Sequence, residues 1–393
     1  MKKNICLYIS TFIYKFGGTE SYAANLISAL QQIDTEFYIT VITENFKNTP
    51  TLTSTALIER LKNAYGAIID ISRFSIIYIS SKEYKGRLAY LIFQNRINNI
   101  TRKFDIFIYC SRGLLTGKAK NNIAIIHFPM VSKTTFSFYK KYPVSRFIAA
   151  YCDRKFRSSY NAFLPNSDFT AFWLRKLWKI PDNKILKLYP PVTPINFNPK
   201  KTKEKCIFVC SRIEKSKCIE ALIEAYLSSK LLTSTFKLII AGSVKNEEQE
   251  YIDFLKRFSG KVTFIFDPER KQIEELYQKS MIFWHAKGFS SDENKQPYLM
   301  EHFGITTVEA MSAGCVPVVI NKGGQKEIVA EGCGYRWNTL EELISYTEEL
   351  ATYPDKLSNF SKAALKRSEL YTTISYNENL RKIITKLYIE GKF

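Results

Sequence analysis

The feature that most constrains this chain is a regular alternation of short apolar segments with longer amphipathic segments. The short segments are rich in β-branched and aromatic residues, and the longer ones carry apolar residues at helical spacing. This alternation is typical of βα units, in which helices connect parallel strands. In the first half, strands are expected at 5–10, 38–43, 76–79, 106–110, 123–127 and 162–165, with a first helix at 20–32.

A proline-rich break separates this series from a second one. Four prolines fall within the ten residues 190–199, and such a stretch continues neither a helix nor a central strand. The second series predicts strands at 206–211, 237–242, 262–266, 281–285 and 316–320. The tail 373–389 predicts one further helix, because Leu380, Ile383, Ile384 and Leu387 share one face.

The predicted fold is therefore α/β, with two Rossmann-like domains built on doubly wound parallel sheets. The expected boundaries are 1–190, 191–372, and 373–393 for a C-terminal helix that crosses back to the first domain. In such sheets ligands bind at the carboxyl ends of the strands. We expect the two domains to face each other across a cleft that holds the site.

The charge of the chain is concentrated in the first domain. The 393 residues carry a net charge of +20, and residues 1–190 contribute 28 basic against 11 acidic side chains. The remaining residues are nearly balanced, with 29 basic and 26 acidic side chains. A one-sided basic domain indicates an anionic partner, either a phosphate-bearing lipid, an anionic membrane surface or nucleic acid.

Several protein classes are disfavoured. The eight cysteines form no CxxC pair and there are only three histidines, so no zinc site can be assembled and buried free thiols are expected. Lys2 and Lys3 precede an apolar run in the manner of a signal peptide, but no small-residue cleavage site follows. No apolar stretch reaches the 18 residues of a membrane span, so we expect a soluble or peripheral protein.

The most informative segment is 301–319, EHFGITTVEAMSAGCVPVV. Gly304 precedes a helical pattern, Gly314 ends it, and a strand-like run follows. Free backbone N–H groups at a helix start attract anions. The candidate donors are those of Phe303, Gly304, Ile305 and Thr306.

Two carboxylates, Glu301 and Glu309, flank this expected anion site. Carboxylates repel phosphate, whereas an ionised carboxylate accepts hydrogen bonds from hydroxyl groups. A ligand with a central diphosphate and a polyol at each end is a nucleotide sugar. The segment therefore favours a nucleotide sugar as the ligand.

Segment 301–319 resembles the retaining glycosyltransferases of family 4, whose fold is called GT-B. The family's E-x7-E motif matches Glu301 and Glu309, and the resemblance implies that Glu301 holds the hydroxyls of the donor sugar and Glu309 the ribose. It also implies that Arg212 and Lys217 clamp the diphosphate. Cys218 stands where the family usually has glycine, which is a departure at this turn.

The first domain carries two further matches. Gly17 and Gly18 follow the first expected strand, in a turn that differs from the GxGxxG fingerprint of nicotinamide enzymes. By resemblance they line the cleft near the donor phosphate, and His127 lies near the donor sugar. Segments 166–170 and 189–192 look most like mannosyltransferases that build lipid-linked oligosaccharides.

Two segments leave alternatives open. The polar stretch 286–300 is longer than in many family members, and it is either a lid over the donor site or a surface excursion. Basic and aromatic residues interleave at 139–143, 154–157 and 172–179, a pattern of membrane-interface or nucleic-acid surfaces. We favour a membrane, although Trp173, Leu174, Leu177 and Trp178 also have the spacing of core residues.

The resemblance implies a retaining hexosyltransferase that needs neither metal nor cofactor. The leaving phosphate would accept the acceptor's proton, no side chain would act as nucleophile, and Glu301 and His127 would position the sugar. The expected donor is GDP-mannose, and the expected acceptor is a glycan or polyprenyl-linked glycan of cell-surface polysaccharide synthesis at the cytoplasmic face of the membrane. The alternatives are a GT-B sugar-nucleotide epimerase and a basic nucleic-acid-binding protein.

Overall fold

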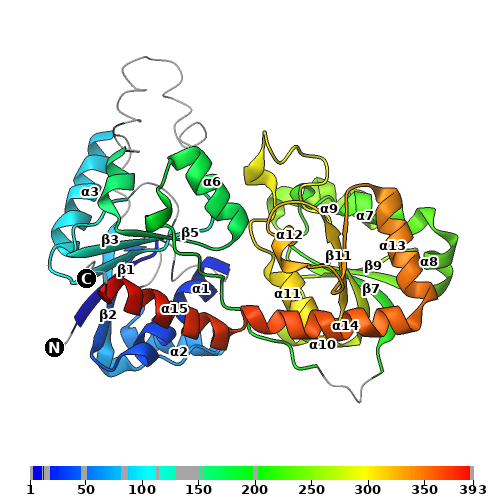
Figure 1. The fold of residues 1–393 in the computed structure, drawn as a ribbon, viewed down its shortest axis with the longest axis horizontal. Helices are drawn as coiled ribbons and strands as arrows, with labels where there is room; N and C mark the ends of the chain where they lie inside the picture. The colour runs from blue at the N-terminus through cyan, green and yellow to red at the C-terminus, as the bar shows by residue number, and fades with distance from the viewer. Residues whose placement is uncertain are drawn as a thin grey trace. The chain divides into compact units, whose positions relative to one another are not determined.

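The computed structural model describes residues 3–10, 12, 18–45, 51–80, 87–111, 115–129, 151, 154–197 and 202–389. The chain forms two compact units (Figure 1). The first unit comprises Met1–Pro191 and Tyr376–Phe393, and the second comprises Val192–Ser375. Each unit is built on a six-stranded sheet in which all the strand pairs are parallel.

The sheet of the first unit has the order β3-β2-β1-β4-β5-β6. Its strands are β1 (Lys3–Tyr8), β2 (Phe37–Asn45), β3 (Phe74–Ser80), β4 (Ile106–Tyr109), β5 (Asn121–Ile126) and β6 (Ala162–Pro165). Its helices are α1 (Gly18–Ile33), α2 (Ser54–Tyr65), η1 (Ile71–Arg73), α3 (Arg87–Thr101), α6 (Asp168–Trp178), η3 (Asp182–Lys184) and α15 (Thr373–Ile389), the last of which begins in the second unit.

Both faces of this sheet are covered, which explains why its strands are apolar throughout. Successive side chains of a strand point to opposite faces. In β1, Ile5 and Leu7 pack in one core with α1, α2 and α15, while Cys6 and Tyr8 pack in a second core with α3 and α6. The sheet is thus doubly wound, as the apolar strand runs predicted.

The sheet of the second unit has the order β12-β11-β10-β7-β8-β9. Its strands are β7 (Glu204–Cys210), β8 (Lys237–Gly242), β9 (Thr263–Phe266), β10 (Ser280–His285), β11 (Val316–Ile320) and β12 (Tyr335–Trp337). Its helices are η4 (Lys215–Lys217), α7 (Ile219–Ser228), α8 (Lys230–Thr235), η5 (Asn246–Glu248), α9 (Gln249–Lys256), α10 (Arg270–Lys279), η6 (Pro297–Leu299), α11 (Ile305–Ser312), α12 (Gln325–Ile328), α13 (Leu340–Thr352), α14 (Pro354–Ser368) and η7 (Glu369–Tyr371).

Helices cover both faces of this sheet as well. Ile207 and Val209 of β7 pack with α7, α8, α9 and α13, whereas Cys206, Phe208 and Cys210 pack with α10 and α11. The predicted fold class of two doubly wound parallel α/β sheets is therefore confirmed. One strand, β12, was not predicted, because it is a three-residue edge strand that follows the glycines Gly332 and Gly334.

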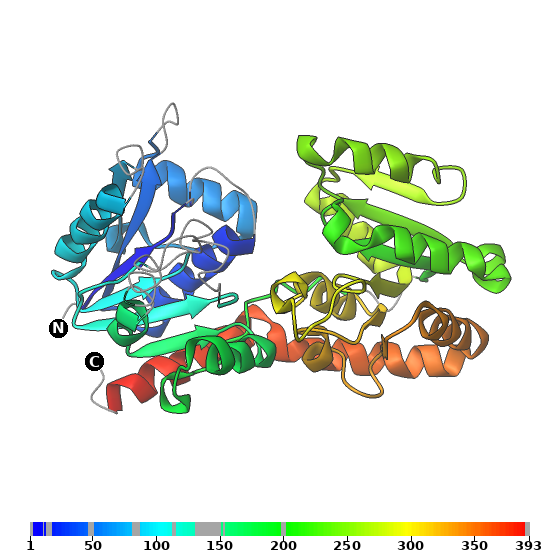
Figure 2. The same ribbon diagram turned by 90° about the horizontal axis from the view of Figure 1, so that it is seen from above.

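The chain passes between the units twice, once near Val192 and once near Ser375, and the segments next to these two points pair with each other within the second unit. Within the proline-rich break, Val192 N–H donates to the carbonyl of Tyr371 at 2.9 Å, and Val192 forms a parallel bridge with Thr372. The chain then continues into α15, whose apolar face joins the core of the first unit (Figure 2, red). The first unit is thus built from both ends of the sequence.

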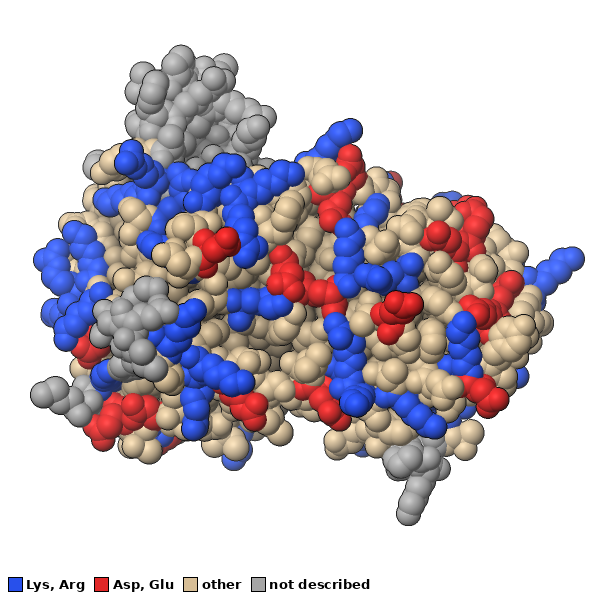
Figure 3. All heavy atoms as spheres, in the orientation of Figure 1, with Lys and Arg blue, Asp and Glu red and all other residues tan. Residues whose placement is uncertain are grey.

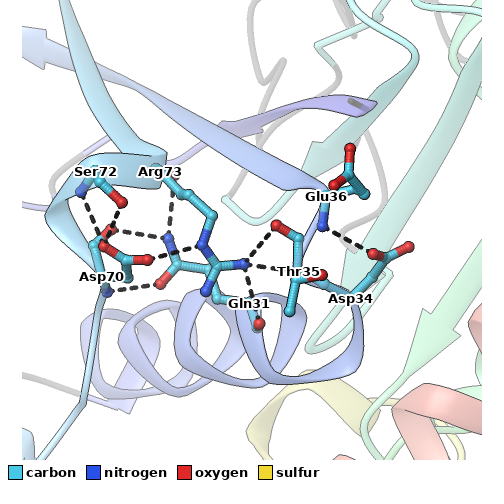
Figure 4. A network of polar contacts seen from close by, with 7 residues as sticks. All are labelled: Gln31, Asp34, Thr35, Glu36, Asp70, Ser72 and Arg73. Carbon is cyan, nitrogen blue, oxygen red and sulfur yellow. Dashed lines mark hydrogen bonds and ion pairs between the residues drawn. The ribbon is translucent and has the colours of Figure 1, made fainter. Parts of the chain in front are cut away.

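A polar network fixes the C-terminal end of α1 (Figure 4). Arg73 Nη1 donates to the carbonyl oxygens of Gln31, Asp34 and Thr35, each at 3.2 Å, and Arg73 Nε donates to Asp70 at 2.8 Å. The Gln31 side chain donates through Nε2 to the carbonyl oxygens of Asp70 and Arg73, and its Oε1 accepts from Asp70 N–H. A cation at the final carbonyls satisfies groups that have no partner within the helix.

Candidate functional site

The strand order of the second unit indicates where a ligand would bind. β7 and β10 are neighbours, and the strand order runs in opposite directions from this pair, toward β9 on one side and β12 on the other. Open α/β sheets bind ligands outside the carboxyl ends of their strands at such a switch point. The segment after β7 carries Arg212 and Lys217, and the segment after β10 carries Lys287.

Three nitrogen groups converge on Glu301 at this point. Its Oε2 lies 2.9 Å from Lys217 Nζ, 3.5 Å from His285 Nε2 and 3.6 Å from Lys287 Nζ. All four side chains are largely buried, with exposed fractions between 4% for His285 and 23% for Glu301. The predicted residues Lys217 and Glu301 are thus brought into direct contact, together with two residues that were not predicted.

The electrostatics of this cluster favour an ionised Glu301. Burial alone would raise the pKa of the Glu301 carboxyl, but Lys217, Lys287 and His285 hold that pKa well below its usual range. Burial lowers the pKa of His285, which is therefore neutral at pH 7, and burial also lowers the pKa of Lys287. Glu301 can accordingly accept hydrogen bonds from hydroxyl groups at neutral pH.

Arg212 lies beside the cluster without joining it. Its Nη1 pairs with Glu214 Oε2 at 2.8 Å, and about half of its side chain is exposed, at 51%. Arg212, Glu214 and Lys217 all act electrostatically on Lys287, so these groups share one region of the surface. The predicted pair Arg212 and Lys217 therefore lies on one loop after β7, with each cation next to a carboxylate.

Cys218 adopts the conformation that glycine would favour at this turn. Its φ of 52° and ψ of 44° are in the left-handed region, and its side chain is buried beside Ser290. The departure from glycine thus preserves the turn at the cost of backbone strain.

Two substitutions at Cys218 separate the strain from the burial. Cys218→Gly is expected to change the free energy of unfolding by less than about 1 kcal/mol, because relief of strain offsets the lost side chain. Cys218→Val adds about one methyl group and places a β-branched residue at positive φ, so it is expected to destabilise by about 1–3 kcal/mol. Chemical denaturation measures both, and equal stability of the two variants would contradict the assignment of strain.

The predicted anion site starts at Gly304, which is the N-cap of α11 with φ of 129°. A Cβ atom there would lie 2.5 Å from Gln325 Nε2, so only glycine fits without a shift of Gln325. The helix begins at Ile305, which places the amides of Ile305 and Thr306 in its first turn. Phe303 precedes the N-cap, and its ring is buried against Tyr371.

Glu309 lies in a second, separate cluster. Its Oε1 accepts from Arg270 Nη1 at 2.6 Å and its Oε2 from the Tyr277 hydroxyl at 3.2 Å. Burial raises the pKa of Glu309, whereas Arg270 and Tyr277 oppose that shift. Arg270 and Tyr277 both belong to α10 and were not predicted as site residues.

The long segment 286–300 is fastened to the loop after β11. Lys322 Nζ donates to the carbonyl oxygens of Gly288, Phe289 and Ser291 at 2.8–2.9 Å. Glu293 accepts from Gly323 N–H at 2.9 Å and from Lys326 Nζ at 3.0 Å. These bonds hold the segment against the second unit and disfavour an unattached surface excursion.

Two predicted residues of the first unit, His127 and Gly18, lie beyond the carboxyl ends of its strands. His127 directly follows β5, its ring meets that of Tyr22 edge-on at 5.5 Å, and its carbonyl accepts from the Thr170 hydroxyl at 3.1 Å. Gly18 is the first residue of α1, whereas Gly17 lies outside the described residues. Both His127 and Gly18 therefore follow strands of the first unit, β5 and β1.

The basic and aromatic segments of the first unit divide into core and surface. Trp173, Leu174 and Trp178 of α6 are buried, so the core interpretation of these residues is confirmed, while segment 139–143 lies outside the described residues. Exposed basic residues remain on α6 and near the end of α3, and one of them, Arg175, pairs with Asp182. These exposed residues are Arg96, Arg102, Lys103, Arg175, Lys176 and Lys179. On the face of the first unit that Figure 3 presents, the blue Lys and Arg side chains predominate over the red Asp and Glu side chains.

Neither a membrane-spanning helix nor a metal cluster occurs among the described residues. None of their helices combines the length and apolar character that crossing a bilayer requires. Within the same ranges, no three His, Cys, Asp or Glu side chains are grouped so that they would hold a metal ion.

Known proteins resemble this chain in sequence and in fold. Residues 194–367 match the family model described as glycosyl transferases group 1. A GDP-Man:Man(3)GlcNAc(2)-PP-Dol alpha-1,2-mannosyltransferase of Dictyostelium discoideum is 25% identical over 175 residues, which are 42% of this chain and 32% of that protein. Sucrose synthase 6 of Arabidopsis thaliana is 26% identical over 263 residues, or 58% of this chain and 26% of the relative. The chain thus spans about a third or less of the length of these relatives.

Solved structures extend the likeness to the whole chain. The structure of Anabaena Alr3699/HepE in complex with UDP has a TM-score of 0.70 at 14% identity and covers 98% of this chain and 100% of its own. WaaG, a glycosyltransferase involved in lipopolysaccharide biosynthesis, has a TM-score of 0.66 at 15% identity, with 97% and 99% covered. The two doubly wound sheets and these likenesses define the GT-B fold class. The likeness to the glycosyl transferases group 1 family model is confined to residues 194–367, which are less than half of the chain.

Proposed function

We propose that the protein is a retaining glycosyltransferase that transfers a hexose from a nucleotide sugar to a glycan or a polyprenyl-linked glycan. The observation that carries the proposal is the contact of Lys217 with Glu301 at the switch point of the second sheet. This contact places a cation suited to a diphosphate beside a carboxylate suited to sugar hydroxyls. The match of residues 194–367 to the glycosyltransferase family supports the same assignment.

In this proposal the donor spans the two clusters of the second unit. Arg212, Lys217 and the first amides of α11 hold the diphosphate, Glu301 accepts hydrogen bonds from the sugar hydroxyls, and Glu309 accepts them from the ribose. The roles that the family resemblance implies for His127, Gly17 and Gly18 of the first unit stay predictions. Fixed cations aimed at the charge that develops on the leaving group lower the barrier to transfer.

The proposed reaction is a substitution with retention. The bond between the anomeric carbon and the leaving oxygen breaks, and its electron pair goes to the nucleoside diphosphate. The acceptor hydroxyl attacks the same face of the sugar, and its proton passes to the leaving phosphate oxygen. No side-chain nucleophile is required, because the acceptor hydroxyl attacks the anomeric carbon directly. No metal is required, because Arg212 and Lys217 provide the positive charge.

The donor and acceptor are open to direct measurement. GDP-mannose is our first choice of donor, because the Dictyostelium relative is a GDP-Man mannosyltransferase. UDP-glucose is the second, because Anabaena Alr3699/HepE has been solved with UDP-glucose. We propose that the acceptor binds the first unit.

Thermal stabilisation against a panel of nucleotides and nucleotide sugars tests the proposal. A donor at a hundred times its dissociation constant is expected to add about 2.7 kcal/mol to the free energy of unfolding. Failure of every nucleotide sugar to stabilise the protein would refute the proposal. Product analysis then separates a transferase from an epimerase, since only the transferase forms a new glycosidic bond.

We also propose that the first unit contacts an anionic membrane from its cytoplasmic side. Leu91 and Ile92 of α3 are 57% and 53% exposed, and the exposed basic residues named above lie on α6 and near the end of α3. Exposed apolar side chains next to cations suit a negatively charged lipid surface. Co-sedimentation with phosphatidylglycerol vesicles measures this contact, and binding of random DNA in place of the vesicles would contradict it.

A further inference from the structure

Among the residues that the structure describes, the ion pairs of the Glu301 carboxylate all fall on one of its two oxygens. Lys217, His285 and Lys287 each approach Oε2, and among the described residues none of these three groups contacts Oε1. A carboxylate held through one oxygen cannot rotate freely, and its other oxygen keeps its full capacity to accept hydrogen bonds.

The partners of Oε2 come from different segments. Lys217 is the last residue of η4, His285 ends β10, and Lys287 follows two residues later. In the proposed function Lys217 also binds the diphosphate, so it serves two anionic groups once the donor is bound. His285 and Lys287 have no such second role, and they keep Glu301 in place.

We propose that His285 and Lys287 are positioning residues that hold Glu301 through Oε2, so that Oε1 accepts a hydrogen bond from a hydroxyl of the donor sugar. This inference rests on the proposed function and deepens it. It assigns recognition of the sugar, as distinct from the nucleotide, to the His285–Lys287 pair acting through Glu301.

The surroundings support a fixed position for Lys287. Its side chain is only 15% exposed, and the segment 286–300 to which it belongs is held by Lys322 through three backbone carbonyls. A buried lysine without a fixed carboxylate partner would carry a large desolvation cost. The segment 286–300 thus presents one cation to Glu301 and is itself held by another.

Substitution of Lys287 separates recognition of the sugar from recognition of the nucleotide. In Lys287→Met, affinity for UDP-glucose or GDP-mannose is expected to fall at least about tenfold, whereas affinity for UDP or GDP changes less than about threefold. Lys287→Arg keeps the charge and is expected to restore the higher affinity for the nucleotide sugar than for the nucleotide. Lys295→Met removes a lysine of the same segment that is 83% exposed, and it is expected to match the wild type.

The pH dependence provides a second readout. The groups around Glu301 are Lys217, His285 and Lys287, with Arg212 and Glu214 beyond them. Loss of the Lys287 charge raises the pKa of Glu301. As the pH is lowered, Glu301 is therefore protonated at a higher pH in Lys287→Met than in the wild type. The affinity difference between the nucleotide sugar and the nucleotide is then lost at that higher pH. A structural role alone would leave that pH unchanged.

Isothermal titration with UDP, GDP, UDP-glucose and GDP-mannose decides between the outcomes. An unchanged affinity for nucleotide sugars in Lys287→Met, or an equal loss for nucleotides and nucleotide sugars, would overturn the positioning role. His285→Asn provides an independent variant with the same expected selectivity. If the wild type binds none of the four ligands, the proposed function itself fails, and the inference fails with it.

Discussion

Lys217→Met is expected to lower the rate of nucleoside diphosphate release from the donor by about 100- to 1000-fold, the usual effect of removing one fixed group that stabilises a developing charge. Lys217 is 12% exposed and contacts Glu301 at 2.9 Å, so its charge acts in a largely desolvated position. The substitution removes both the cation of the diphosphate and the nearest partner of Glu301. A coupled assay for UDP or GDP release measures the effect.

The control for this variant is Lys215→Met. Lys215 lies two residues earlier in the same 3-10 helix and is exposed, so its loss is expected to change the rate less than about twofold. Circular dichroism and the unfolding midpoint check that both variants fold. Equal rates in Lys217→Met and Lys215→Met would show that the diphosphate binds elsewhere.

Arg270→Met is expected to reduce the free energy of unfolding by about 2 kcal/mol at pH 7. Glu309 is only 10% exposed, and without Arg270 its carboxylate would keep the Tyr277 hydroxyl as its remaining partner. Breaking a fully buried ion pair costs about 3–5 kcal/mol, and the cost is smaller here because half of the Arg270 side chain is exposed.

The effect of Arg270→Met depends on pH in a defined direction. Burial already raises the pKa of Glu309, so the folded state holds this proton more tightly than the unfolded state. The resulting stability is present below the ordinary pKa of glutamate and is lost as the pH rises through the folded-state value. Removing Arg270 raises the folded-state pKa of Glu309 further, because Arg270 opposes the effect of burial.

The deficit of Arg270→Met is therefore expected to be small near pH 4 and to grow toward pH 7. Denaturation in urea across this range measures the deficit. Arg270→Met combined with Glu309→Gln removes the buried charge and serves as the matched control, with stability close to that of the wild type. A deficit that stays constant with pH would contradict this account of Glu309.

Much of the fold could be predicted because the residue pattern of each strand indicates whether that strand is buried. A strand of a doubly wound sheet is buried on both faces, so its apolar run is visible in the sequence without knowledge of its neighbours. This holds for β8 and β11, whose predicted and observed limits coincide. It fails for β12, which has only three residues and pairs on one side.

The site was only partly predictable, because its geometry depends on strand order. Glu301 and Lys217 were found through motifs, but their contact requires β7 and β10 to be neighbours. His285 was overlooked although it ends a predicted strand, which is the same signal that drew attention to His127. Lys287 and Arg270 carry no local signal, since a lysine or arginine after a strand is usually solvated.

The composition of the first unit constrains the order in which the protein can fold during synthesis. The same core contains β1 and α1, which are made before the second unit, and five residues that follow that unit: Tyr376, Leu380, Ile383, Ile384 and Leu387. These residues leave the ribosome only after the whole second unit has emerged. The core of the first unit therefore stays incomplete while the second unit is being made, and its exposed apolar face needs protection from aggregation for that period.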